Sequence, residues 1–233
     1  MSKCVVVTGG SRGIGKSTIA HFYQQGWQTI NISRTPCDLP GVTNVEIDLS
    51  SSQHIDANIQ RLQSVMKEFS QIALVHNAAY YQADSVDSIT MAGVRQTLEV
   101  NVVSTMALNS FFIPLMLPQS SIIYIGSTLS TKAVPGSASY IVSKHALIGL
   151  MKATCQDLRK QQIHTCCICP GLVDTDLLRI AVEENVIKDI LANQVLGQRL
   201  IKPQEIAELV YFCAMNPTIN GATIHANLGQ GGE

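Results

Sequence analysis

The sequence predicts one α/β domain, a doubly wound parallel sheet with helices on both of its faces. Short runs rich in β-branched residues alternate with longer helical patterns throughout the chain of 233 residues. Several short runs, such as Cys4–Val7 and Ile72–Val75, are apolar at every position instead of at alternate positions. Such runs are typical of strands buried on both faces, as in a parallel sheet that helices cover.

The bounds of the elements follow from this alternation. Seven strands are expected, over Cys4–Thr8, Gln28–Ser33, Thr43–Asp48, Ile72–His76, Ile122–Ile125, His164–Cys169 and Ala222–Ala226. The expected helices are Gly15–Gln24, Ser52–Phe69, Val94–Phe112, Ala138–Arg159 and Pro203–Met215. No Pro/Gly/Ser-rich linker and no repeat interrupts this order, so residues 1–233 are assigned to a single domain with a seven-stranded sheet. Residues 174–199 break the rhythm, and we interpret them as a helical insertion.

Composition excludes several classes of protein. The net charge of -1 lacks the basic excess that nucleic-acid or acidic-membrane surfaces need. The longest apolar stretch, Phe111–Leu117, contains Pro114 and is far shorter than the roughly 20 residues of a spanning helix. Charged residues make up only 14%, against a usual share of about 25%. This shortage indicates surface hidden against a second subunit or, alternatively, surface covered by uncharged Gln, Asn, Ser and Thr.

The seven cysteines indicate a reducing compartment, and we expect a cytoplasmic protein. Cys166 and Cys169 form a C-x-x-C pattern, but residues three apart on a strand face opposite sides of the sheet. Buried free thiols are therefore expected. The histidines have no metal-ligand spacing, and no metal site is expected.

A glycine-rich loop, Thr8–Gly15, joins the first strand to the first helix. Glycines at such a turn let backbone N–H groups approach a phosphate at the positive end of the helix. Two phosphate loops fit. Gly10–Ser17 satisfies G-x-x-x-x-G-K-[ST], the P-loop of phosphotransferases. Such enzymes need an Asp that holds magnesium, and the strands ending near His76 and Ser127 lack it, so this alternative is disfavoured.

The other spacing, T-G-x-x-x-G-x-G, resembles the short-chain dehydrogenase/reductase family in its classical form. The resemblance extends over nearly the whole chain and implies a Rossmann-type dinucleotide-binding fold. It implies that the loop contacts the cofactor through Gly9, Ser11, Arg12, Gly13, Ile14 and Gly15.

The end of the second strand indicates which dinucleotide is bound. A NAD site usually carries Asp or Glu there, accepting from the ribose 2′-hydroxyl, but this strand ends in Ser33-Arg34 and the first carboxylate is Asp38. A guanidinium would instead bind a 2′-phosphate. In the family, basic residues at the positions of Arg12 and Arg34 imply NADP(H) in preference to NAD(H).

Further cofactor residues follow from the resemblance. Asp48 and Leu49 match the pair that contacts the adenine, although Asp48 alone could cap the following helix. Asn77-Ala78-Ala79 matches the Asn-Ala-Gly turn, with Ala in place of the Gly. On the nicotinamide side the matching residues are Pro170, Gly171, Val173 and Thr175.

The expected catalytic residues are Asn101, Ser127, Tyr140 and Lys144. Tyr140 and Lys144 share one face of a helix because they are four residues apart. Ser127 follows the fifth strand, where hydroxyls point into the ligand crevice of a doubly wound sheet. In order and context these residues match the family's Asn-Ser-Tyr-Lys tetrad.

Carbonyl reduction explains these residue types. A free Tyr has a pKa of about 10, which a neighbouring ammonium lowers toward the working pH. Lys144 would supply that charge and, as the resemblance implies, hold the nicotinamide ribose. Ser127 would hold the substrate oxygen beside Tyr140. Asn101 would position a water that links Lys144 to solvent.

The sequence thus predicts an NADP-dependent oxidoreductase that interconverts a carbonyl compound and an alcohol, in the reducing direction. A non-catalytic NADP(H)-sensing regulator is the alternative, and a P-loop phosphotransferase is a further one. Candidate pocket residues are Tyr80, Tyr81, Gln82, Leu129, Leu172 and Leu177, with residues 174–199 as a substrate-facing lid. In this family the helices Val94–Phe112 and Ala138–Arg159 commonly pack against a second subunit, so a homodimer or homotetramer is expected.

Overall fold

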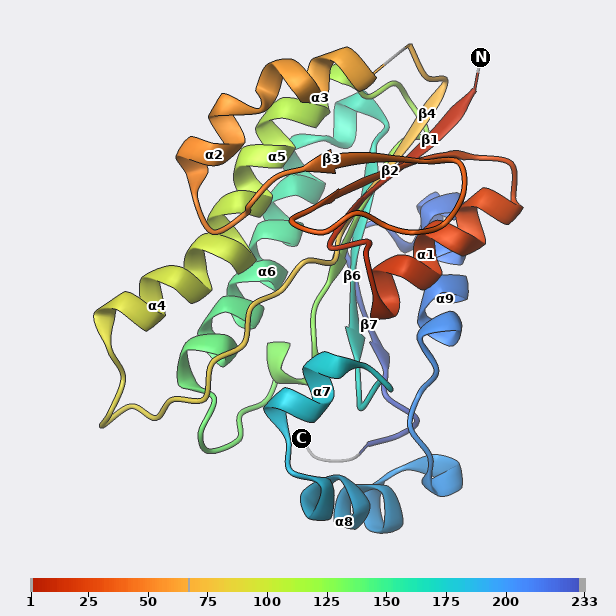
Figure 1. Ribbon diagram of the computed structural model, residues 1–233. Coiled ribbons are helices and arrows are strands. Elements are labelled where there is room, and N and C mark those ends of the chain that lie inside the picture. The colour runs from red at the N-terminus through yellow and green to blue at the C-terminus, as the bar shows by residue number, and fades with distance from the viewer. Residues whose placement is uncertain (1, 67, 231–233) are drawn as a thin grey trace.

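The computed structural model describes residues 2–66 and 68–230 and contains one parallel sheet of seven strands. Their order across the sheet is β3-β2-β1-β4-β5-β6-β7 (Figure 1). The strands are β1 (Lys3–Thr8), β2 (Gln28–Ser33), β3 (Val42–Glu46), β4 (Gln71–His76), β5 (Ser121–Ile125), β6 (His164–Pro170) and β7 (Ala222–Ala226). The predicted doubly wound, Rossmann-type sheet is confirmed. The order reverses between β1 and β4, which opens a crevice at the carboxyl ends of these strands.

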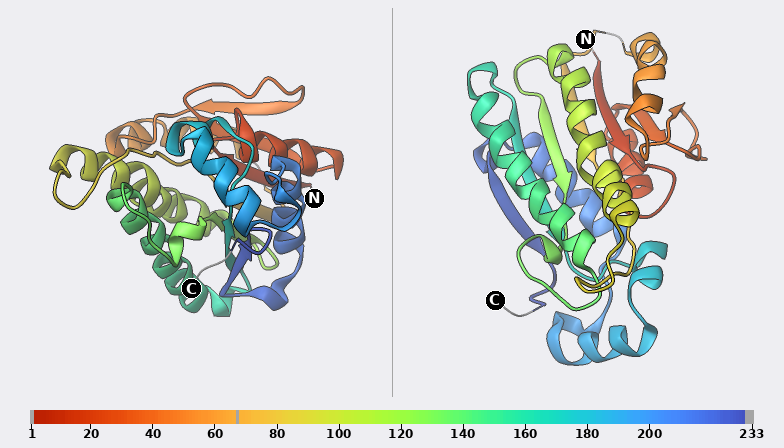
Figure 2. Two further views of the ribbon diagram at one scale, coloured as in Figure 1. Left: turned by 90° about the horizontal axis from the view of Figure 1, so that it is seen from below. Right: turned by 90° about the vertical axis from the view of Figure 1, so that its left-hand side faces the viewer.

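Helices cover both faces of the sheet (Figures 1 and 2). On one face α1 (Gly13–Gln24) packs against α9 (Pro203–Met215). The other face carries α2 (Ser52–Ala57), α3 (Ile59–Val65), α4 (Met91–Leu98), α5 (Ser104–Phe112) and α6 (Ala138–Asp157). Two apolar cores result, one around Phe22 and Trp27 and one around Phe112 and Tyr124. The continuous apolar runs of the strands are explained by this double cover.

Two predicted helices are interrupted. The predicted helix Ser52–Phe69 is divided at Asn58, whose side-chain amide donates to the His54 carbonyl, and it ends at Val65. The predicted helix Val94–Phe112 begins at Met91 and contains a π-helical turn at Glu99–Val103. A single inserted residue produces such a turn, which often occurs at functional sites. Asn101 lies within it.

The segment 174–199 contains α7 (Asp176–Ala181) and α8 (Glu184–Gln194), as expected for a helical insertion. Both helices lie beyond the carboxyl ends of the strands, apart from the two helical layers (Figure 1). A bridge between Val173 and Ile201 closes the base of the segment. Ile180 is 67% exposed and Leu196 is 76% exposed. The segment therefore presents apolar side chains to its surroundings.

One helical run in the described residues, Met91–Leu115, is long and apolar enough to cross a membrane by length and composition, with a hydropathy of 1.3. The run was not expected from the sequence, because polar residues such as Asn101 and Asn109 divide its apolar stretches. In the fold this run lies along the sheet, with Leu108 and Phe112 in the core. One third of its apolar window (33%) is buried within the chain.

Candidate active site

The glycine loop has the conformation that close contact with a phosphate requires. Gly9 and Gly13 have φ values of +67° and +54°, which L side chains rarely adopt. A Cβ at Gly15 would lie 2.3 Å from the Gly9 carbonyl oxygen. Ser11, Gly13 and Ile14 are half-buried at this turn. The loop therefore depends on glycine at three of its predicted positions.

The first turn of α1 can bind an anion. Arg12 occupies the N-cap position without a side-chain cap, and the first turn carries no acidic residue. The N–H groups at the start of a helix of 12 residues thus have no side-chain partner from the cap. A pyrophosphate fits both this partial positive charge and the tight loop. These residues suit a dinucleotide, with Gly9 to Gly15 holding its phosphates.

Lys16 does not serve as a P-loop lysine in this structure. Its Nζ lies 2.6 Å from Oδ1 of Asp38, in the loop after β2. The lysine of a P-loop reaches the β- and γ-phosphates, which this ion pair does not permit. The geometry argues against the phosphotransferase alternative.

The loop after β2 holds the predicted 2′-phosphate ligand Arg34 with its side chain exposed, next to half-buried Ser33. Arg12, the other predicted cation, is 3.2 Å from Asp176 at the start of α7. Arg12 and Arg34 are thus both exposed, one in the glycine loop and the other just after β2. Arg12 also links the glycine loop to the segment 174–199.

Asp48 does not cap α2, because that cap is Ser51, whose side chain accepts from the His54 N–H. The Asp48 carboxylate instead accepts from the Ser50 N–H, which lowers the pKa of Asp48. The backbone N–H of Asp48 donates to Nδ1 of His54. Leu49 is buried in the core.

The turn after β4 is attached to the glycine loop. The Asn77 side-chain amide donates to the carbonyls of Thr8 and Gly9, both at 3.0 Å. The Thr8 hydroxyl accepts from the N–H groups of Asn77 and Ala78. The turn and the loop therefore form one rigid edge of the crevice. Ala79 follows in this turn and does not have a positive φ, so alanine in place of glycine there causes no backbone strain.

The Pro170–Thr175 segment closes the crevice from the side of β6. A Cβ at Gly171 would lie 2.9 Å from the Asn227 Cα, so the chain passes closely there. Thr175 is the N-cap of α7, with its hydroxyl accepting from the Leu178 N–H. The Thr175 methyl group would be 3.1 Å from a Cβ at Gly13. Thr175 therefore lies against the glycine loop, and Val173 is buried behind it.

Three of the four predicted catalytic residues lie close together. Tyr140 and Lys144 are on α6, with the Lys144 Nζ 5.5 Å from the Tyr140 ring centroid. Ser127, after β5, is close enough to the Tyr140 hydroxyl to lower its pKa, and its own hydroxyl accepts from the Leu129 N–H at 3.1 Å. Tyr140 is 8% exposed and Lys144 is 2% exposed. The Lys144 ammonium donates to the Ile125 carbonyl at 2.8 Å.

Burial is the largest influence on the pKa values of Tyr140 and Lys144. It raises the pKa of Tyr140 well above its ordinary value of 10.0, and the Ser127 hydrogen bond offsets only part of the rise. It lowers the pKa of Lys144 from 10.5 to about 8. The expected lowering of the Tyr140 pKa by the Lys144 ammonium is not seen in the chain alone, where desolvation of the phenolate is the largest influence.

Asn101 has a different environment from the one expected. Its side chain is 1% exposed and accepts from the Tyr80 N–H at 2.7 Å. Its amide donates to the Tyr80 carbonyl and to the Ser143 hydroxyl. Asn101 thereby attaches the segment after β4 to the catalytic helix. Its action on a water remains a prediction.

The candidate pocket residues are all half-buried, and they are Tyr80, Tyr81, Gln82, Leu129, Leu172 and Leu177. The Tyr81 ring meets that of Tyr140 edge to face, with centroids 5.3 Å apart. The Tyr81 hydroxyl is 3.2 Å from that of Ser137, just before α6. Tyr81 therefore bounds the site on the side of Tyr140.

The cysteines and histidines form no further site in the part of the chain that is described. All seven cysteines are free and buried, as predicted. Cys166 and Cys169 belong to the two opposite cores, so the C-x-x-C pattern does not bring their sulfurs together. No group of His, Cys, Asp or Glu in residues 2–66 and 68–230 could hold a metal ion.

Sequence patterns missed two amides, the buried Asn31 on β2 and the half-buried Asn44 on β3. These residues are partners in the sheet register. The side-chain Oδ1 of Asn31 accepts from the Gly10 N–H in the glycine loop at 2.9 Å. Asn31, between Ile30 and Ile32 on a strand expected to be buried, was the signal available, since a buried amide requires partners.

A glycine loop at a topological switch point, together with a Ser, Tyr and Lys group, defines a nicotinamide-dependent oxidoreductase. Comparison with known proteins agrees. Residues 9–230 match the family described as Enoyl-(Acyl carrier protein) reductase. Dehydrogenase/reductase SDR family member 6 of Aquarana catesbeiana is 32% identical over 227 residues, covering 91% of this chain and 89% of its own.

Two other similar proteins cover almost the full length. The 3-oxoacyl-[acyl-carrier-protein] reductase FabG of Salmonella typhimurium is 29% identical, with 98% of this chain and 97% of its own covered. The ligand-free structure of Thermoplasma acidophilum aldohexose dehydrogenase has a TM-score of 0.87 at 28% identity, with 98% and 94% covered. The chain belongs to the short-chain dehydrogenase/reductase family. It is an oxidoreductase that acts on CH-OH or C=O groups and uses a nicotinamide cofactor and a small-molecule substrate. The phosphotransferase and the non-catalytic regulator are thereby set aside.

Proposed function

We propose that this chain is an NADP(H)-dependent reductase of ketones or aldehydes, with Ser127, Tyr140 and Lys144 as catalytic residues. The observation that carries the proposal is the placement of buried Tyr140 beside buried Lys144, with the Lys144 Nζ 5.5 Å from the Tyr140 ring centroid. Because burial raises the pKa of Tyr140, the phenol is the resting form. A phenol can donate a proton to a developing alkoxide, as reduction requires.

NADP(H) in preference to NAD(H) is supported by the charges at the end of β2. Arg34 is exposed there, where a carboxylate would repel a 2′-phosphate. The nearby carboxylate of Asp38 is paired with Lys16. Arg12 is exposed at the glycine loop and can approach the same phosphate by exchanging its contact with Asp176.

The residues of the chain would act as follows. NADPH, when bound, supplies a hydride. Ser127 donates a hydrogen bond to the substrate carbonyl oxygen and holds it beside Tyr140. Tyr140 donates its phenolic proton to that oxygen as negative charge develops on it. Lys144, whose pKa is about 8, stabilises the resulting phenolate when protonated. Tyr81, packed on the Tyr140 ring, limits how the substrate approaches.

A carbonyl panel with NADPH tests the proposal. Ketones, diketones, quinones, pteridines and sugars are offered, and loss of absorbance at the nicotinamide band is followed. Tyr140→Phe should lower kcat on the best substrate by about 100-fold or more, because general acid catalysis typically contributes that much. Unchanged turnover in Tyr140→Phe would overturn the assigned mechanism.

Cofactor preference is tested with Arg34→Asp. The variant should lower kcat/KM for NADPH and raise it for NADH, since a carboxylate there repels the 2′-phosphate and accepts from a 2′-hydroxyl. A wild-type preference for NADH would refute the NADP assignment.

We also propose that the chain is a cytoplasmic homodimer or homotetramer. The apolar side chains of Val103, Met106 and Val142 are exposed on α5, its preceding π turn and α6. Association through these helices would cover them and would account for the low charge content. Buried free thiols support a reducing compartment. A monomer by light scattering at micromolar concentration would contradict the oligomer.

A further inference from the structure

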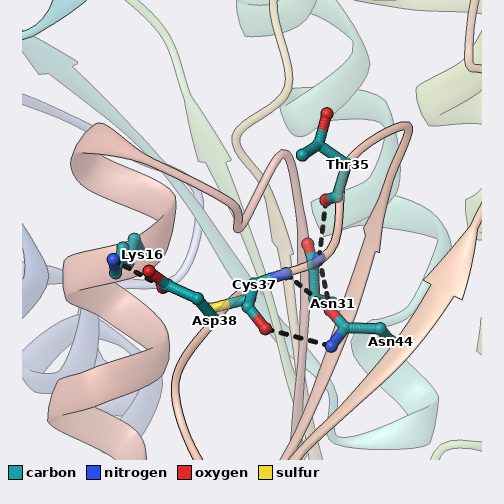
Figure 3. A network of polar contacts seen from close by, with 6 residues as sticks. All are labelled: Lys16, Asn31, Thr35, Cys37, Asp38 and Asn44. Atoms are coloured by element: carbon teal, nitrogen blue, oxygen red, sulfur yellow. Dashed lines mark hydrogen bonds and ion pairs between the residues drawn. The ribbon is translucent and has the colours of Figure 1, made fainter.

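Two amide side chains, those of Asn31 and Asn44, hydrogen-bond the backbone of the loop that carries Arg34. Asn31 on β2 is 1% exposed, and its Nδ2 donates to Oδ1 of Asn44 on β3 at 2.8 Å. The same Nδ2 contacts the Ser33 hydroxyl at 3.0 Å and the Thr35 carbonyl at 3.4 Å. Figure 3 shows both amides lying between the strands and the loop.

The Asn44 side chain hydrogen-bonds both backbone polar groups of Cys37, as the backbone of a neighbouring strand would. Its Oδ1 accepts from the Cys37 N–H at 2.8 Å, and its Nδ2 donates to the Cys37 carbonyl at 3.1 Å (Figure 3). Cys37 itself is buried at 3% exposure. Asp38, the next residue, is paired with Lys16 on α1. The backbone on both sides of Arg34–Pro36 is therefore anchored.

The same amide network reaches the phosphate loop. Oδ1 of Asn31 accepts from the Gly10 N–H, and a Cβ at Gly10 would lie 2.7 Å from that oxygen. One buried side chain thus connects the glycine loop to the loop after β2. Placing the buried Asn31 amide and the half-buried Asn44 amide in a sheet is unfavourable unless their polar atoms are hydrogen-bonded, and here loop backbone supplies most of the partners.

We propose that Asn31 and Asn44 are positioning residues that preorganise the Arg34 loop and so set the discrimination between NADPH and NADH. The inference rests on the proposed role of Arg34. A flexible loop would lose conformational freedom each time Arg34 bound the 2′-phosphate, whereas an anchored loop has already lost it. NADH, which lacks that phosphate, gains little from the anchoring.

Asn44 is the residue to change, because Asn31 also supports the glycine loop, which both cofactors use. Asn44→Ala should raise KM for NADPH by about tenfold and KM for NADH by less than about threefold, since only NADPH needs the ordered guanidinium. Hydrogen exchange at the Cys37 amide should accelerate in the same variant, because its acceptor is gone. If Asn44→Ala does not fold, Asn44→Ser, which keeps one hydrogen-bonding atom, should show the same changes to a smaller extent.

The matched control is Asn220→Ala. Oδ1 of Asn220 also accepts from a backbone N–H, that of Thr165, at 2.9 Å. This contact lies at the amino-terminal end of β6, away from the crevice. Asn220→Ala should reduce thermal stability while leaving the ratio of NADPH to NADH kcat/KM at the wild-type value.

A double-mutant cycle with Arg34→Ala decides the proposal. If Asn44 acts through Arg34, Asn44→Ala should change the cofactor ratio in the wild type but not in the Arg34→Ala background. If Arg34→Ala lowers the ratio and Asn44→Ala does not, the positioning role is wrong and the NADP assignment stands. If Arg34→Ala itself leaves the ratio unchanged, both are wrong. An equal effect of Asn44→Ala in both backgrounds would also overturn the role.

Discussion

Replacing Lys144 by methionine measures what the buried ammonium costs the folded protein. Burial lowers the pKa of Lys144 from 10.5 to about 8. Since one pKa unit corresponds to about 1.4 kcal/mol, keeping this lysine protonated at pH 7 costs the folded state about 3 kcal/mol. Lys144→Met removes that cost. It also leaves the Ile125 carbonyl without its donor, which costs about 1–3 kcal/mol.

The pH dependence separates these two contributions. Between pH 8 and 10.5 the unfolded chain keeps the proton that the folded chain has released, so wild-type stability rises with pH. Relative to Lys144→Met, the wild type should gain about 2–3 kcal/mol in unfolding free energy between pH 7 and pH 10. The lost hydrogen bond to Ile125 does not titrate and contributes equally at both pH values.

Urea unfolding of both proteins at pH 7, 8.5 and 10 gives the difference directly. The exposed Lys152 on the same helix provides the control, and Lys152→Met should follow the wild-type pH dependence. A difference between wild type and Lys144→Met that is constant across this pH range would refute the reasoning, because it would show that Lys144 titrates alike in the folded and unfolded chains.

The remaining predictions concern two glycines, Gly15 in the glycine loop and Gly149 on α6, and the ion pair of Arg12. Gly15→Ala should abolish cofactor binding by calorimetry, because its Cβ would lie 2.3 Å from the Gly9 carbonyl oxygen; retained binding would contradict the loop geometry. Gly149→Ala on α6 has no atom within 4 Å of the new Cβ and should raise stability by about 0.5–1 kcal/mol in urea, where a loss would show unrecognised crowding. Asp176→Asn removes the ion-pair partner of Arg12 and should tighten NADPH binding by about two- to fivefold, whereas an unchanged Kd would mean that Arg12 does not contact the phosphate.

Features that depend on local sequence were predictable. The glycine loop follows a buried strand and precedes a helix, so its shape is encoded by eight consecutive residues. Tyr140 and Lys144 share a helix face because they are four residues apart, wherever that helix lies in the fold. Ser127 could be placed because it comes shortly after the end of a strand. The sheet was predictable because its strands are apolar on both faces.

Features that depend on tertiary packing could not be predicted from the sequence. The Asn31–Asn44 contact exists because β2 pairs with β3 in one register, which the alternation of strands and helices does not specify. The high pKa of Tyr140 arises from burial that no spacing reveals. The π-helical turn at Asn101 interrupts a run whose pattern predicts one continuous helix, and Asn101 makes tertiary hydrogen bonds there to Tyr80 and Ser143. Asp38 is paired with Lys16 only because the loop folds back to α1.

The most direct test of the proposed chemistry is the fate of the hydride. NADPH that carries deuterium at both C4 positions is consumed with the best carbonyl substrate, and the alcohol is examined by mass spectrometry and NMR. A reductase of this kind should place the deuterium on the former carbonyl carbon, while the new hydroxyl proton exchanges with water. An alcohol without deuterium at that carbon, or consumption of NADPH without alcohol, would contradict the account.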